Sequence, residues 1–125
     1  MLEVIAAAAV TGVALGAIAP LWVGQVRLLA ETRRERLGLE ELANQAERLA
    51  AVPMGEVDRY LAGLDVSADL REFLPGAVLT AERAGPSPLG ERVVLTLAWA
   101  SPGRRARPLA LVTWIPPEPD QETTR

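Results

Sequence analysis

Residues 4–26, VIAAAAVTGVALGAIAPLWVGQV, decide the fold, because they form an unbroken run of 23 residues without a charge. As an α-helix this run would be about 35 Å long, which is enough to cross a hydrocarbon core of about 30 Å. Trp22 lies near one end, where membrane helices favour aromatic side chains. The run therefore predicts a membrane helix, and a buried helix of a soluble protein is the alternative.

An acid, Glu3, stands directly before this run. A signal peptide begins with positive charge, and a soluble core helix distributes its acids over an outer face. Neither pattern explains a single carboxylate at this position. Glu3 is therefore a candidate functional residue, with an acid hydrated at the membrane interface as the simpler interpretation.

Small residues recur every fourth position along the run, at Ala8, Gly12, Gly16, Pro20 and Gly24. They form a stripe along which another helix could approach closely. Pro20 removes a backbone donor and clashes with the preceding turn, so we expect the helix to kink or loosen between Gly16 and Pro20. Gly12 and Gly16 are therefore candidate contact positions for another subunit.

The helix continues beyond the apolar run. Helix-forming residues extend as far as Pro53, weakened only by Gly38, so one helix of about 75 Å is expected over residues 2–52. Its second half has an apolar stripe, with charged residues on the other faces: Leu39, Leu42, Ala43, Ala46, Leu49 and Ala50. A coiled-coil seam would need a longer stripe, so packing against the C-terminal part of the same chain is favoured.

The remainder of the chain predicts two short helices, at 56–61 and 68–73, with Ser67 as N-cap of the second and Pro75-Gly76 after it. Three strands are expected at 77–82, 92–100 and 109–115. In the middle strand the bulky residues alternate, and residues 101–108 (SPGRRARP) have the turn signals of a hairpin. The prediction is an α+β fold in which a small antiparallel meander lays its bulky face on the long helix.

Three segments follow from this reading: a transmembrane and assembly helix (1–26), a globular part (27–115), and a tail (116–125) expected to be disordered because it has nothing apolar to bury. The chain has no Cys and no His, which excludes thiolate and Ser/His chemistry and the common zinc sites. We expect no enzyme, catalytic residue, metal or cofactor; a carboxylate-pair enzyme is a remote third hypothesis. The net charge of −3 argues against nucleic acid as a partner.

Two charged groups have no expected function. The acids Asp58, Asp65, Asp69 and Glu72 match no ion-binding loop. Arg104, Arg105 and Arg107 in the predicted hairpin could contact phosphate or an acidic partner, although solvated charge is the simpler interpretation.

The residues LEVIAAAAVTGVALGAIAPLW (2–22), with Glu3 at the start and Pro20 further along, resemble the type IV pilin superfamily. The short chain is most similar to minor pseudopilins of type II secretion systems or to minor type IV pilins. The spacing of Glu3 and Pro20 matches that of the family's glutamate and helix-breaking proline. The resemblance covers the first half of the chain well and the second half in architecture.

The resemblance implies a structural subunit of a pseudopilus or pilus, anchored in the bacterial inner membrane by one span, with its C-terminal domain periplasmic or extracytoplasmic. It implies that Glu3 pairs with the free N-terminal amine of a neighbouring subunit, and that Pro20 marks a stretch that loosens during assembly. The implied partners are other pilin or pseudopilin subunits, the inner-membrane assembly platform, membrane lipid and a prepilin peptidase.

That peptidase would remove a short basic leader lying upstream of Met1 and methylate the new N-terminus. The leader also bears on orientation. Arg27, Arg33, Arg34 and Arg36 follow the span, and the positive-inside rule applied to them alone would place the C-terminal domain in the cytoplasm. A basic leader would reverse that inference.

A second hypothesis is a single-pass membrane adaptor of the cell envelope that dimerises through the small-residue stripe.

Overall fold

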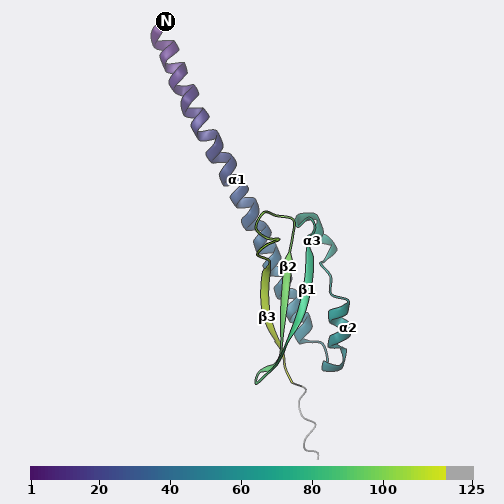
Figure 1. Cartoon of the computed structure of the whole chain (residues 1–125). Coiled ribbons are helices and arrows are strands. Elements are labelled where there is room, and N and C mark those ends of the chain that lie inside the picture. The colour runs from purple at the N-terminus through teal and green to yellow at the C-terminus, as the bar shows by residue number, and fades with distance from the viewer. Residues whose placement is uncertain (118–125) are drawn as a thin grey trace, which may run out of the picture. The chain divides into compact units, whose positions relative to one another are not determined.

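The computed structural model describes residues 1–117. Its elements follow in chain order: α1 (Leu2–Ala50), the short 3₁₀ helix η1 (Met54–Glu56), α2 (Val57–Ala62), α3 (Ala68–Phe73), β1 (Val78–Ser87), β2 (Gly90–Ala98) and β3 (Leu109–Ile115). The C-terminal part of α1 runs along a three-stranded antiparallel sheet (Figure 1). The predicted α+β fold class is confirmed, and the architecture is pilin-like.

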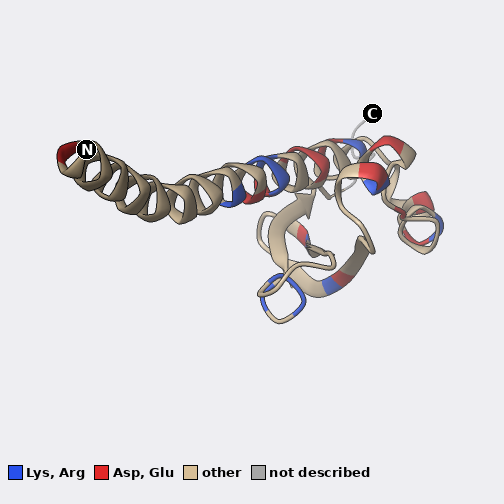
Figure 2. Cartoon of the chain, turned by 90° about the horizontal axis from the view of Figure 1, so that it is seen from above, with Lys and Arg blue, Asp and Glu red and all other residues tan. Residues whose placement is uncertain are grey.

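The chain divides into two compact units, Met1–Glu35 and a second unit that begins at Arg36. The first unit is the N-terminal part of α1, and every residue from 1 to 30 is exposed. Figure 2 shows its apolar stretch between the acid at the N-terminus and the first arginine. The helix runs through Pro20 without a break, so Pro20 lies inside α1 rather than at its end.

In the second unit one face of α1 is buried, but it is not the predicted stripe. Leu42 and Leu49 are fully buried and Ala46 is partly buried, as expected. The prediction is wrong for three other positions, which are exposed: Leu39, Ala43 and Ala50. Their places are taken by three residues that the pattern of large apolar side chains does not mark: Gly38, Glu41 and Gln45. The buried face is thus rotated toward a glycine and two polar residues.

Gly38 explains part of this rotation. A Cβ atom added at Gly38 would lie 3.0 Å from Leu109 Cδ1 and 3.3 Å from both Leu97 Cδ2 and Trp99 Cζ3. These distances are tighter than nine in ten contacts of real Cβ atoms, so the missing side chain allows the sheet to pack closely on the helix backbone. The glycine that weakens the helix in isolation is therefore a packing position in the folded chain.

The sheet has the strand order β1-β2-β3, and both pairings are antiparallel, as the predicted meander requires. The bulky face of the middle strand, Val93, Leu95 and Leu97, is fully buried together with Trp99, which directly follows the strand, and these residues form the centre of the core. The hairpin between β2 and β3 is also confirmed, with Leu97 opposite Leu109.

β1 is longer than the predicted strand at 77–82, because it continues to Ser87. Its register with β2 shifts between Arg83 and Pro86, and Gly85 between them has a φ of 91°. A glycine in this left-handed region accommodates such an irregularity without the steric cost that another residue would have. Gly85 and Pro86 therefore lie at an irregularity within the strand and do not end it.

The short helices lie where they were expected. α3 begins after Ser67, but the Ser67 hydroxyl makes no capping hydrogen bond to the helix. Gly76 follows with a φ of 66°, which suits a glycine after a helix end. Pro116 and Pro117 follow β3 without regular structure. The rest of the predicted disordered tail, residues 118–125, lies outside the described residues.

Candidate assembly surface

The exposed apolar helix of the first unit is the strongest candidate for a functional surface. Among the described residues, α1 is the one helix long and apolar enough to cross a membrane, judged by length and composition. Its large apolar side chains are exposed on all sides, including Val4, Ile5, Val10, Val13, Leu15, Ile18, Leu21, Trp22, Val23 and Val26. A continuous apolar surface of this extent is not stable in water, so it requires cover from lipid or from other protein.

Glu3 lies in the first turn of α1, where a negative charge is favoured by the helix dipole. Its neighbours along the helix are apolar, and Leu2 and Val4 are 84% and 71% exposed. Within residues 1–117 Glu3 forms no ion pair. The carboxylate is thus available to a group from outside the described chain.

The small-residue stripe is open. A Cβ atom added at Gly12, Gly16 or Gly24 would meet nothing within 4 Å. Pro20 lies on the same stripe, and because it has no N–H, the Gly16 carbonyl one turn earlier loses its usual intrahelical donor. The stripe therefore combines space for a neighbouring helix with a backbone acceptor that a neighbour could satisfy.

The helix does not bring Glu3 and the stripe together. At about 100° per residue, the nine positions from Glu3 to Gly12 turn the helix through about 900°, which places the two on opposite faces. Gly16 and Pro20 follow Gly12 with a drift of about 40° per four residues. A neighbouring helix that packs against one face of α1 cannot contact both Glu3 and Gly12. Substitutions at Glu3 and in the stripe can therefore be tested separately.

A buried polar network in the second unit was missed by the sequence analysis. Glu41 is only 8% exposed, and its carboxylate accepts hydrogen bonds from Gln45 Nε2 at 3.0 Å and from the Ser67 amide and hydroxyl, both at 3.3 Å. The network joins α1 to the start of α3, because the Ser67 hydroxyl donates a hydrogen bond to Glu41 and does not cap α3. The spacing of Glu41 and Gln45, one turn apart beside Leu42 and Leu49, was the available signal.

Tyr60 extends this network to α2. Its hydroxyl donates to Gln45 Oε1 at 2.8 Å. Burial raises the pKa of Tyr60, with a smaller contribution from the Glu41 carboxylate and an opposing one from Arg48. The tyrosine therefore stays protonated and remains a donor over the physiological pH range. These bonds fix the α2–α3 segment on one face of α1.

Exposed ion pairs hold the other side of the segment. Arg83 on β1 bonds both Asp58 on α2 and Glu91 on β2, and Arg71 on α3 bonds Asp65. The hydrogen bond from Arg83 lowers the pKa of Glu91, and that from Arg71 lowers the pKa of Asp65. Two members of the acidic set noted in the sequence are thus paired with arginine. Within the part of the chain that the structure describes, no three His, Cys, Asp or Glu side chains are grouped to hold a metal ion.

The chain was compared with protein-family models, curated proteins and solved structures. No protein-family model, no curated protein and no solved structure matches the chain.

Proposed function

We propose that the chain is a structural minor pilin or pseudopilin subunit, which assembles through its N-terminal helix into a type II secretion pseudopilus or a type IV pilus. The observation that carries the proposal is the division of one helix into two surfaces. Residues 1–30 are exposed and contain the uncharged run 4–26 with an acid before it, whereas the part of α1 from Arg36 onward has a face buried against an antiparallel sheet. This is what a subunit needs if it inserts in a bilayer and later packs in a filament.

Glu3 would set the register between subunits. A carboxylate among apolar helices is costly unless it is paired, so Glu3 would form an ion pair with the N-terminal amine of the next subunit. Its lack of an ion pair within the described residues leaves it free for this purpose. The role is mechanical and involves no turnover, so the protein would not be an enzyme.

The subunit would be held in the bacterial inner membrane by one span, with its sheet domain on the periplasmic side. Its partners would be other pilin or pseudopilin subunits, the inner-membrane assembly platform and a prepilin peptidase that processes a leader upstream of Met1. The decisive measurement is the N-terminal mass of the protein expressed from its natural locus, in strains with and without that peptidase. We expect a peptidase-dependent, methylated N-terminus; the same unprocessed N-terminus in both strains would refute the proposal.

A test of the register role follows from the opposite placement of Glu3 and the stripe. Glu3→Ala should abolish co-assembly with partner pilins, measured by crosslinking in the membrane, while insertion of the protein is unchanged. Glu40→Ala is the matched control, because Glu40 is an exposed acid on the part of α1 in the second unit. Co-assembly that survives Glu3→Ala would remove the register role.

The open stripe favours a second candidate, a single-pass membrane adaptor of the cell envelope that dimerises through its helix. In that case Gly12→Leu with Gly16→Leu should abolish self-association in a bilayer, because the added side chains fill the space at the stripe. Glu3→Ala should then have no effect. The opposite pattern supports the filament subunit.

A further inference from the structure

The connection between β2 and β3 is an ordered basic loop, which we call the arginine hairpin (residues 101–108). Gly103 has a φ of 95°, and the loop is closed by hydrogen bonds from the Arg104 amide to the Ser101 carbonyl at 3.1 Å and from the Arg107 amide to the Gly103 carbonyl at 2.8 Å. The Arg104 guanidinium lies 5.6 Å from the centre of the Trp99 ring. Arg104 is therefore part of the loop's own packing.

Arg105 and Arg107 have a different environment. Both are exposed, and within residues 1–117 neither forms an ion pair. No acidic residue occurs between Arg92 and Pro117, so the residues that directly flank the loop supply no counter-charge. The one acid of these two strands, Glu91, lies at the opposite end of β2 and is paired with Arg83. The hairpin thus presents two exposed guanidinium groups that have no ion-pair partner within residues 1–117. Guanidinium groups bind phosphate through charge-assisted hydrogen bonds.

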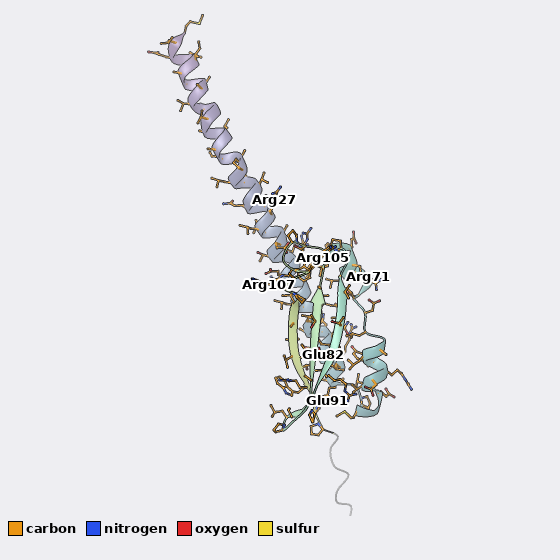
Figure 3. The ribbon with its side chains drawn as sticks, in the orientation of Figure 1. Arg27, Arg71, Glu82, Glu91, Arg105 and Arg107 are labelled. Atoms are coloured by element: carbon orange, nitrogen blue, oxygen red, sulfur yellow. The ribbon has the colours of Figure 1, made fainter. Side chains whose placement is uncertain are left out.

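The hairpin lies at the end of the second unit where the chain arrives from the apolar helix. Leu109 and Trp99, which flank the loop, are the residues against which Gly38 packs, and Gly38 is the third residue of this unit. Figure 3 shows Arg105 and Arg107 at the end of the sheet opposite Glu91. The strand register agrees, because Leu97 and Leu109 pair at one end and Glu91 and Ile115 at the other.

The length of the connection limits how far this end can be from the apolar segment. Only residues 27–35 separate Val26 from the first residue of the second unit. Nine residues span at most about 32 Å when fully extended and about 14 Å as a helix. If residues 4–26 cross a bilayer, the loop end of the unit is therefore tethered within reach of the phospholipid headgroups.

We propose that the arginine hairpin binds the phosphate groups of anionic phospholipids at the surface of the membrane that holds the apolar segment. The inference rests on the membrane insertion contained in the proposed function. Because the chain is net negative at −3, a local excess of positive charge is needed for its folded part to approach an anionic surface. The hairpin adds to the charge of the arginines that follow the apolar run, and it would hold the sheet domain at the membrane before assembly.

The test uses the full chain reconstituted in phosphatidylcholine vesicles, with and without phosphatidylglycerol. The chain has no Cys, so Ala106→Cys gives a single labelling position in the hairpin. We expect a fluorophore at residue 106 to be quenched by headgroup-attached quencher only when phosphatidylglycerol is present, and the quenching to weaken as salt is raised. Leu89→Cys, in the turn between β1 and β2 at the other end of the sheet, is the control position and should show no such change.

Arg105→Gln with Arg107→Gln should lower the ratio of bound to free hairpin roughly 30-fold, which corresponds to the attraction of two cations near an anionic surface. Arg48→Gln with Arg59→Gln is the matched control, because it removes two exposed arginines that form no ion pair within residues 1–117. The control should leave the quenching unchanged.

The outcomes separate the two proposals. Protein that floats with the vesicles but shows no lipid-dependent quenching at residue 106 overturns the role of the hairpin and leaves the membrane helix standing. Equal loss of quenching in both arginine variants would show attraction by overall charge and also overturns it. Protein that fails to float with either vesicle overturns the membrane insertion, and the inference falls with it.

Discussion

Glycines and acids occur in both parts of α1, but their surroundings differ between the N-terminal and the C-terminal part. The glycines show this difference most clearly. At Gly38 an added Cβ would meet Leu109, Leu97 and Trp99 at 3.0–3.3 Å, whereas at Gly12 and Gly16 it would meet nothing within 4 Å. Gly38 allows the sheet of the same chain to pack closely against the helix. The other two leave a surface open to something outside the described chain.

The acids show the same contrast. Glu41 is buried and accepts three hydrogen bonds, while Glu3 is exposed among apolar residues and forms no ion pair within residues 1–117. The hydrogen-bond partners of Glu41 all lie within the subunit, whereas Glu3 is available to a group from another molecule. Substitutions in the second unit should therefore change folding stability, and those in the first unit should change association.

The largest expected effect is at the centre of the core. Trp99→Ala should lower the free energy of unfolding by about 3–5 kcal/mol, because it removes a side chain that is 1% exposed and leaves a cavity. Hydrogen exchange of the β2 amides in detergent-solubilised protein would measure the loss. Leu21→Ala, at a side chain that is 67% exposed, should change the same exchange rates by less than about 0.5 kcal/mol. Similar effects at both positions would mean that the first unit also packs on the sheet.

A smaller change in the free energy of unfolding is expected at Gly38, where the sheet packs against the helix. Gly38→Leu should cost about 1–3 kcal/mol, because the new side chain overpacks the contact with Leu97, Leu109 and Trp99 and outweighs the gain in helix propensity. Urea unfolding followed by circular dichroism would measure it. Gly12→Leu is the matched substitution and should leave the urea midpoint unchanged. A stabilised Gly38→Leu variant would show that the sheet can move away from the helix at no cost.

The polar network should contribute slightly less. Glu41→Ala leaves the Ser67 amide and the Gln45 side chain without their acceptor, and we expect a loss of about 1–3 kcal/mol in the same unfolding experiment. Glu3→Ala should not change the unfolding curve. If Glu41→Ala is as stable as the parent protein, water replaces the carboxylate and the network does not position the α2–α3 segment.

The sequence predicts the elements well where one residue pattern determines them. The 23-residue uncharged run, the alternation in β2 and the turn signals at 101–108 each led to the correct structure. The sequence predicts the buried face of α1 less well, because large apolar side chains point to Leu39 and Ala43, whereas burial depends on the sheet's approach at Gly38. That approach is a tertiary contact, and no local periodicity encodes it.

The candidate site divides in the same way. Glu3, Gly12, Gly16 and Pro20 could be chosen from the sequence, because an acid, glycines and a proline are conspicuous in an apolar helix. Glu41 was not chosen, since a glutamate in a charged helix half is usually solvated and its spacing to Gln45 is only a weak signal of burial. Its burial depends on Ser67, 26 residues away, supplying two donors. The helical geometry that separates Glu3 from Gly12 follows from the long continuous helix, which the sequence predicts over residues 2–52.

The smallest expected effect concerns pH and the ion pairs at the surface of the second unit. The hydrogen bond from Arg83 lowers the pKa of Glu91 in the folded protein, and the carboxyl has its ordinary pKa of about 4.3 when the chain is unfolded. The unfolded chain therefore binds the proton more readily, so the contribution of this pair to stability is complete above that ordinary pKa. It is lost as the pH falls through the lowered pKa of the folded state.

Urea midpoints measured from neutral pH down to acid should therefore fall more steeply for the parent protein than for Arg83→Gln, and the two curves should converge at the acid end. Because Arg83 and Asp58 are solvent-exposed and Glu91 is only partly buried, the separation at neutral pH should be small. Arg105→Gln is the control: Arg105 forms no ion pair within residues 1–117, so this variant should follow the parent curve. Parallel curves for Arg83→Gln and the parent would mean that Arg83 does not hold α2 on the sheet, and that the buried bonds of Glu41 and Tyr60 position this segment without it.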